Sequence, residues 1–312
     1  MTILSIIDIE TTGIDPNEHA IVEIAAIDLI DGAICLPRSS LIRPPHSIPA
    51  ASSAIHHLVD ADVAAAPMAR DIVPEILGDQ TGRVYVAHNA KFESAFLAPF
   101  LPGATWACSY KAALRIWPQA EGYSNQFLRY WLGLAFGGEA MPPHRALPDC
   151  HVTARIFAEL LKYASVEDMI GWFGEPPLLP HVTFGKHRGK KWDELPVDYL
   201  QWVRDQKDMD PDLVWNAKHE LDHRSAEANA AISERLRIEK ETRDAYVGLA
   251  VKIAKEARTV DDLRKWLNSD EEKANRERYR VSLGTPEYAK IVAACSERKA
   301  ELLATQPLEK AA

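Results

Sequence analysis

Two apolar segments joined by a turn constrain the fold of this chain more than any other feature of its sequence. Residues 21–30 and 33–42 are apolar runs, and Asp31-Gly32 between them is a dipeptide typical of a two-residue β-hairpin turn. The run at 3–9 is apolar and rich in β-branched residues, which predicts a buried strand before the hairpin. The chain is therefore expected to open with three strands.

After the hairpin, short strands alternate with helices. Residues 84–87 predict a short strand that leads into a helix at about 90–100, and residues 125–132 and 148–163 have helical spacing. A sheet that opens with a hairpin and continues through helical crossovers is a mixed α/β sheet flanked by helices. We expect this architecture for residues 1–176.

The composition changes twice in the rest of the chain. The Pro-rich segment 174–180 is the first plausible linker. Residues 177–220 hold a basic cluster beside glycines and several aromatic residues, and we expect a small α+β element there. Across 221–312, 35 of 92 residues are charged and helical spacing dominates. This predicts an α-helical C-terminal extension of three helices, the first long and exposed.

Local patterns mark helix ends in the extension. Ser269-Asp-Glu-Glu272 has the form of a capping box, and Gly284-Thr285-Pro286 that of a helix stop, an N-cap and a first-turn proline. The first helix also carries a partial apolar stripe, formed by Ile232, Leu236, Val247, Val251 and Ala254. The stripe could pack on the N-terminal domain, pair with a second copy of the chain or bind a protein partner.

The net charge of −9 is not spread evenly. Residues 1–177 hold 11 Lys and Arg against 20 Asp and Glu, residues 178–220 hold 7 against 8, and residues 221–312 hold 18 against 17. The surplus acid of the first segment is either a solvated acidic surface or a site that holds divalent cations, and charge alone does not decide between them.

The cysteines and the N-terminal segment indicate the cellular compartment of the protein. The four cysteines lie far apart without a CxxC pair, which argues against structural zinc and against a disulfide framework. The opening MTILSIIDIETTG lacks a basic start, and no stretch reaches about 18 uninterrupted apolar residues. We therefore expect a cytoplasmic protein with neither a signal peptide nor a membrane partner.

The first cluster of chemically capable residues is Asp8-Ile-Glu10, at the end of the first predicted strand. Because side chains alternate along a strand, both carboxylates lie on one face. Their mutual repulsion is relieved if both bind Mg²⁺ or Mn²⁺, which prefer oxygen ligands. Thr11-Thr12-Gly13 follows, and a glycine turn there lets the backbone approach a ligand closely. An ordinary strand end that runs into solvent is the alternative.

The second cluster, His88-Asn89-Ala-Lys-Phe92-Glu93, falls at a strand-to-helix junction. In one interpretation Asn89 caps the helix, Phe92 packs in the core and Glu93 faces solvent. In the other, the junction holds a nucleotide and Glu93 turns toward metal ions.

The third cluster is His144-Arg-Ala-Leu-Pro-Asp149. An aspartate near a helix start is ordinarily a capping or helix-dipole residue, and a loop histidine is ordinarily a surface residue. A loop histidine is also what a hydrolytic site needs, because an imidazole suits a general base near neutral pH.

Jointly, the three clusters resemble the exonuclease motifs of the DnaQ-like (DEDDh) superfamily, which read DIETTG, HNxxF plus an acid, and HxxxxD in this chain. Within it, the chain is similar to the exodeoxyribonuclease X family. The segments that carry this similarity are IVEIAAIDLIDG, VYVAHNAKFE, TWACSYKAALRIWP, YSNQFLRYWLGL, HRALPDC, FGKHRGK and PVDYLQWV. Roughly residues 1–220 are covered, and 221–312 are not.

The resemblance implies an RNase H-like fold and metal-dependent hydrolysis of DNA from 3′ ends to 5′-mononucleotides. It implies two Mg²⁺ (or Mn²⁺) ions per site, bound by Asp8, Glu10, Glu93 and Asp149. The catalytic residues would be Asp8, Glu10, His144 and Asp149, with His144 as general base. The residues expected at the nucleotide are Thr11, Thr12, Gly13, His88, Asn89 and Phe92.

Glu93 departs from the family pattern, which has aspartate at this position. The extra methylene moves the carboxylate by roughly 1–1.5 Å. Glu93 could still hold the second metal, directly or through water; otherwise the second metal binds weakly.

A basic cluster follows the linker and consists of Lys186, Arg188, Lys190 and Lys191. It is either a solvated loop or a phosphate-contacting handle without sequence preference. Trp192, Tyr199 and Trp202 could stack on unpaired bases. For Tyr199 and Trp202, the core of the small element is the stronger expectation.

Several functions share these motifs. A DNA exonuclease that prefers single-stranded 3′ ends follows from the resemblance, whereas the motifs alone also fit an exoribonuclease, because discrimination depends on contacts to the 2′-OH. A polymerase-associated proofreading subunit and a catalytically weak nucleic-acid-binding subunit are further alternatives.

Overall fold

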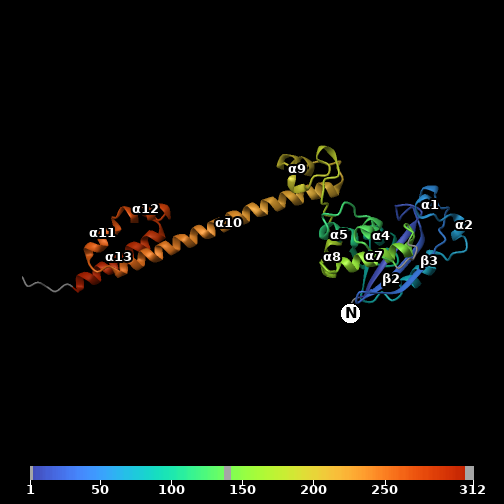
Figure 1. The fold of residues 1–312 in the computed structure, drawn as a ribbon, viewed down its shortest axis with the longest axis horizontal. Helices are drawn as coiled ribbons and strands as arrows, with labels where there is room; N and C mark the ends of the chain where they lie inside the picture. The colour runs from blue at the N-terminus through green and yellow to red at the C-terminus, as the bar shows by residue number, and fades with distance from the viewer. Residues whose placement is uncertain (1–2, 137–141, 306–312) are drawn as a thin grey trace, which may run out of the picture. The chain divides into compact units, whose positions relative to one another are not determined.

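The computed structural model describes residues 3–136 and 142–305 (Figure 1). Its contacts divide the chain into two units, Met1–Leu221 and Asp222–Ala312.

The first unit is built on a five-stranded sheet in the order β3-β2-β1-β4-β5. β1 pairs antiparallel with β2 and β2 with β3, whereas β1 pairs parallel with β4 and β4 with β5. The predicted mixed sheet with an opening hairpin is therefore confirmed. The strands are β1 (Ile3–Thr11), β2 (Ile21–Ile30), β3 (Ala33–Leu41), β4 (Arg83–Ala87) and β5 (Thr105–Cys108).

The hairpin turn has the backbone that its sequence predicts. Asp31 and Gly32 both have positive φ, 49° and 80°. Two successive positive φ values match a type I′ turn, which follows the twist of the paired strands.

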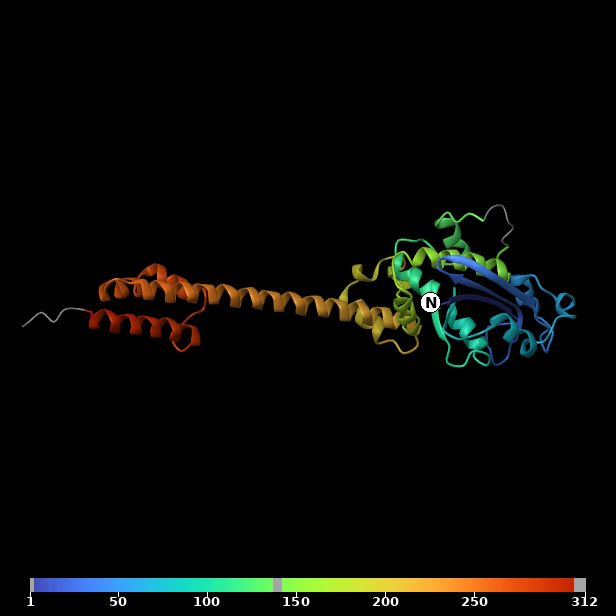
Figure 2. The same cartoon turned by 90° about the horizontal axis from the view of Figure 1, so that it is seen from below.

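Helices cover both faces of the sheet (Figure 2). One core lies between the sheet and the layer that contains α7, and the other lies between the sheet and the layer that contains α3 and α4. The helices are α1 (Ala50–His56), α2 (Asp60–Val63), α3 (Ala69–Leu77), α4 (Ala90–Leu97), α5 (Ser109–Ile116), α6 (Asn125–Trp131), α7 (Ala146–Leu160) and α8 (Val166–Gly174).

Side-chain alternation along β1 decides which layer each residue meets. Leu4 and Ile6 belong to the core on the α7 side, whereas Ile7 and Ile9 belong to the opposite core. A period of two therefore sends residues 8 and 10 toward α7.

The small element after the linker has its own core, formed by Val182, Trp192, Leu195, Leu200, Val203, Leu213 and Ala217. It contains two 3₁₀ turns, Gly185–His187 and Trp192–Glu194, then α9 (Val197–Arg204) and the start of α10 (Pro211–Glu256). The expected β part is limited to one antiparallel bridge, between His181 and Lys191.

The second unit packs the end of α10 against α11 (Val260–Leu267), α12 (Asp270–Arg278) and α13 (Pro286–Ala304). Within residues 222–305 there are four helical segments, not the three predicted, because the chain breaks again at Asn268-Ser269. Thr285 caps α13 with Pro286 in its first turn, and this prediction is confirmed.

The predicted capping box of α12 is only half right. Ser269 accepts the Glu272 N–H at 3.2 Å, as an N-cap should. The Glu272 carboxylate does not complete the box, because it is buried and accepts the Tyr246 hydroxyl at 2.5 Å. A tertiary contact has replaced the local one.

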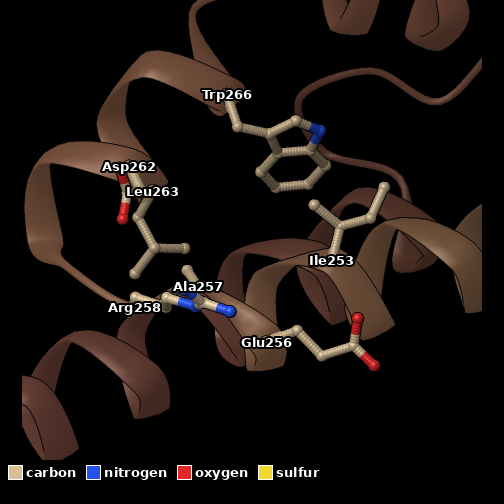
Figure 3. A pocket seen from close by; sticks show the side chains of 7 residues that line it. All are labelled: Ile253, Glu256, Ala257, Arg258, Asp262, Leu263 and Trp266. Atoms are coloured by element: carbon tan, nitrogen blue, oxygen red, sulfur yellow. The ribbon is translucent and has the colours of Figure 1, made fainter.

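The apolar stripe of α10 is buried in one part and exposed in another. Val247 and Ala254 are buried within the second unit, whereas Ile232 and Leu236 are 57% and 59% exposed. A cavity of about 310 Å³ opens where α10 ends and α11 begins, with Trp266 on one side (Figure 3). Within the described residues, no helix is both long and apolar enough to cross a membrane.

Candidate active site

Three carboxylates converge between β1 and α7. Asp8 and Glu10 come from the last residues of β1, and Asp149 comes from the first turn of α7. One oxygen of each lies within 4.8 Å of one oxygen of each of the others. The fold thus joins two clusters that are about 140 residues apart in the sequence.

Burial and mutual repulsion disfavour the charged forms of these carboxyl groups. Burial raises the pKa of Asp8 well above its usual range, and the charges of Glu93, Asp149 and Glu10 add to this rise. Burial, then Asp149 and Glu23, raise the pKa of Glu10 to about 8. Such a cluster favours any bound cation that neutralises it.

Glu93 adds a further carboxylate, which is buried on the first turn of α4. Its side chain is 4% exposed, and its Oε2 atom has no hydrogen-bond partner among the described residues. Burial is the main cause that raises its pKa to about 8. A buried oxygen without a partner is costly, and a cation would satisfy it. The residues present therefore fit divalent metal binding, although Glu93 lies outside the three-carboxylate group.

His144 is tied to this cluster through its backbone. Its N–H donates to Asp149 Oδ2 at 2.8 Å, while Gln126 Nε2 donates to Asp149 Oδ1 at 3.0 Å. His144 has a φ of 60°, which is uncommon for a residue with a Cβ. His144 is exposed. Hydrogen bonds therefore hold both oxygens of Asp149, and one of the two donors is the backbone N–H of the candidate base, His144.

A partly buried ion pair that the sequence did not predict anchors the same loop. Arg145 donates from Nε and Nη2 to the two oxygens of Glu23, at 2.9 and 2.8 Å. The Ala146 N–H donates to Glu23 Oε2 at 3.1 Å. Glu23 stands opposite Glu10 in the β1–β2 register. An acid inside the apolar run IVEIAAIDLI was the available sequence signal.

Comparison with known proteins agrees with this geometry. Residues 5–157 match the model of the family described as Exonuclease. Exodeoxyribonuclease 10 of Escherichia coli K12 is 38% identical over 230 residues, which cover 70% of this chain and 99% of that protein. The chain belongs to the exodeoxyribonuclease X family. It is a hydrolytic nuclease of the DnaQ-like class.

Two further relatives match a smaller share. DNA polymerase III subunit epsilon of Aquifex aeolicus is 26% identical over 50% of this chain and 79% of that protein. A solved structure, exonuclease X in complex with 5′ overhanging duplex DNA, is 37% identical and covers 54% of this chain and 98% of its own, with a TM-score of 0.48.

In this exonuclease, the hydroxyl groups of the Thr-Thr-Gly turn after β1 form hydrogen bonds with nearby backbone groups. The Thr11 hydroxyl donates to the Gly13 carbonyl at 2.6 Å, and the Thr12 hydroxyl accepts the Ala20 N–H at 3.0 Å. A Cβ at Gly13 would lie 2.4 Å from the ring of His19. A residue with a Cβ at position 13 would therefore have to displace the His19 ring. The close approach of this turn to a ligand stays a prediction.

His88 is likewise held by the protein. Its Nδ1 lies 2.9 Å from Ser109 Oγ, and its Nε2 lies 2.7 Å from the Tyr123 carbonyl. Burial lowers its pKa to about 4, so the ring is neutral. Both ring nitrogens are used, so the imidazole is fixed in the wall of the site. The contact of His88 with a nucleotide stays a prediction.

A hollow of about 540 Å³ adjoins this wall, lined by His88, Asn89, Tyr110, Tyr123 and Ser124. Asn89 occupies the N-cap position of α4, but its exposed side chain makes no capping bond and stays available to a ligand. Phe92 is half-buried against Phe96. Tyr110 and Tyr123 were not predicted, because they lie outside the three motifs.

Burial of the aromatic residues after the linker differs from the prediction. Trp192 is buried in the core of the small element, so it is not a stacking platform. Trp202 is 49% exposed and is not a core residue. The side chains of Lys186, Arg188, Lys190 and Lys191 are exposed, outside the carboxylate cluster.

Proposed function

We propose that this exonuclease hydrolyses DNA from 3′ ends to 5′-mononucleotides with two divalent cations, Mg²⁺ or Mn²⁺. The observation that carries the proposal is the convergence of Asp8, Glu10 and Asp149, with Asp149 bonded to the backbone of His144. Glu93 completes the set of metal ligands, because its buried oxygen needs a partner.

Each residue has a role that its position supports. When bound, two divalent cations activate a water molecule and offset the charge that develops on the displaced phosphodiester. Asp8, Glu10, Glu93 and Asp149 hold these ions. His144 accepts the proton of the attacking water, because its exposed imidazole lies on the loop that Asp149 fixes. Asn89 and Phe92 contact the terminal nucleotide beside the hollow at His88.

DNA is the proposed substrate because the relative that matches past the linker is named an exodeoxyribonuclease. A single-stranded 3′ end is the preferred form, since the site must reach a separated terminal nucleotide. RNA is the alternative substrate. Polymerase proofreading is less well supported, because the DNA polymerase III relatives match only about half of the chain.

We further propose three parts for the chain, namely a nuclease domain at 1–176, a small element at 177–220 and a helical extension at 221–312. The four free thiols support a reducing, cytoplasmic location. For the extension we propose self-association or a protein partner, because its side chains Ile232 and Leu236 are exposed.

One incubation series tests the function. Single-stranded DNA and RNA of the same sequence, both labelled at the 5′ end, are incubated with Mg²⁺, with Mn²⁺ and with EDTA. We expect a ladder shortened from the 3′ end on DNA with either metal and an intact strand in EDTA. A ladder on RNA alone would assign a ribonuclease, and intact strands under every condition would contradict the proposal.

A further inference from the structure

The small element holds a second candidate site, outside the carboxylate cluster. An open cavity of about 590 Å³ has aromatic walls formed by Phe184, Tyr199 and Trp202, with Lys186 at its edge. The ring centroid of Tyr199 lies 5.5 Å from that of Trp202 and 6.5 Å from that of Phe184. Trp202 leaves about half of its surface, 49%, in solvent. Large flat rings exposed side by side are typical of a binding surface.

The loop that carries the cations is fixed by the backbone. The Val182 N–H donates to the Lys190 carbonyl and the Gly189 N–H donates to the Val182 carbonyl, both at 2.8 Å. Gly185 and Gly189 have φ values of 61° and 84°, which favour glycine. A Cβ at Gly185 would lie 3.2 Å from the Tyr199 hydroxyl. The basic cluster is therefore presented by a closed loop packed on an aromatic residue, not by a free coil.

Charge and aromatic surface meet at one edge of this cavity. Lys186 Nζ lies 5.5 Å from the centroid of the Tyr199 ring. His187 lines the cavity, and neither of its ring nitrogens has a hydrogen-bond partner among the described residues. Asp198 also lines it, and its carboxylate accepts the Tyr199 N–H at 2.9 Å. Arg188, Lys190 and Lys191 add three exposed cations on the same loop.

We propose that this cavity holds unpaired bases of a DNA strand on Trp202 and Tyr199, while Lys186 and its neighbours contact the phosphates. The strand's identity as DNA rests on the proposed function. Aromatic faces beside cations suit single strands, whose bases present free faces, and give little sequence preference. A duplex keeps its bases stacked, and an acidic peptide would leave the aromatic faces unused. The site would hold the enzyme on its strand between hydrolytic steps.

The test measures strand binding by the full-length chain with hydrolysis disabled by Asp8→Asn. Fluorescence anisotropy follows two labelled probes of equal charge, a single-stranded oligothymidylate of about 15 nucleotides and its abasic counterpart. Trp202→Ala should weaken binding of the oligothymidylate by roughly 5- to 100-fold and leave binding of the abasic probe unchanged. Trp202→Phe should restore most of the lost affinity.

Lys186→Ala should weaken binding of both probes and reduce the slope of log affinity against log salt by about 0.7. The matched controls are Tyr163→Ala, which removes an aromatic residue that is 67% exposed, and Lys207→Ala, which removes an exposed lysine outside the cavity. Neither control should change either affinity.

The inference is overturned if Trp202→Ala binds the oligothymidylate as well as Tyr163→Ala does, or loses the same affinity for both probes. The phosphate contact is overturned if Lys186→Ala and Lys207→Ala have equal salt slopes. Nucleotide release by the chain with Asp8 intact is measured separately. Base-dependent binding without release would contradict the proposed function alone.

Discussion

Asp8, Glu10, Glu93 and Asp149 are kept close together at a cost in folding free energy. The pKa of each is raised, chiefly by burial. Among them, Asp149 accepts hydrogen bonds from two donors, Gln126 and His144. At the scale of the residue, removal of the carboxylates from water and their mutual repulsion are therefore costs that bound cations would relieve.

The raised pKa values of these carboxyl groups predict how the stability of the fold depends on pH. Glu10 and Glu93 have ordinary pKa values near 4.5, raised to about 8 in the folded protein. The folded state therefore binds their protons more tightly than the unfolded state does. Their contribution to stability is complete below about pH 4.5 and is lost as the pH rises to about 8.

We expect the melting temperature in EDTA to fall between pH 5 and 8, and Mg²⁺ to raise it most at the upper end. Scanning calorimetry at several pH values measures both effects. Glu10→Gln should flatten the decline in EDTA. A melting temperature that is independent of pH in wild type, or equal metal stabilisation at pH 5 and 8, would contradict this account.

Glu93 is tested by two substitutions. Glu93→Gln should lower the hydrolysis rate roughly tenfold or more, with Mn²⁺ restoring more activity than Mg²⁺, because Mn²⁺ binds such ligands more tightly. Glu93→Asp should change the concentration of metal that gives half-maximal rate. Rates of both variants are measured across a titration of each metal. If both variants match wild type, Glu93 is not a metal ligand.

At the scale of the element, the sequence predicts what depends on local periodicity. The hairpin, β1 and the helices that begin near residues 90, 125 and 148 follow from spacing and turn residues. The short β5 and the helices between β3 and β4 were missed, because segments of this length carry weak periodic signals. The Glu23–Arg145 pair was missed for another reason, since it joins residues 122 positions apart.

That pair predicts a loss of activity from a residue outside the metal ligands. Arg145→Ala leaves the buried Glu23 without its counter-ion and frees the loop that carries His144. We expect the rate of the bound complex to fall roughly 10- to 100-fold, as for other residues that orient metal ligands.

The control for Arg145→Ala is Arg38→Ala, which removes an ion pair to the buried Asp28 elsewhere on the sheet. Arg38→Ala should lower the melting temperature and keep the rate. Single-turnover rates of both variants, measured below their melting temperatures, distinguish an effect of Arg145 on the rate from an effect on stability alone. Equal rates for the two variants would mean that Arg145 contributes stability only.

At the scale of the whole molecule, all the proposed catalytic residues lie in the unit Met1–Leu221. The unit Asp222–Ala312 has its own buried clusters, and the resemblance to the exonuclease family did not cover it. Sequence periodicity could not show that Val247 and Ala254 pack within that unit while Ile232 and Leu236 stay exposed. That division depends on where α11 to α13 fold back.

Removal of residues 243–312 should therefore leave hydrolysis nearly unchanged. The shortened chain retains every residue of the carboxylate cluster, the basic loop and the exposed stretch of α10. Rates of nucleotide release at saturating DNA are compared with those of the full chain, and circular dichroism checks folding. A folded truncated chain that no longer hydrolyses DNA would show that the second unit takes part in catalysis.

The central claim is that the carboxylates between β1 and α7 form a metal-dependent hydrolytic centre. Single-turnover shortening of 5′-labelled DNA from its 3′ end, followed across a Mg²⁺ titration for wild type and Asp8→Asn, tests it most directly. We predict a saturable dependence on Mg²⁺ in wild type and a rate lower by on the order of 10³-fold or more in the variant. A variant that retains the wild-type rate and Mg²⁺ dependence would contradict the account.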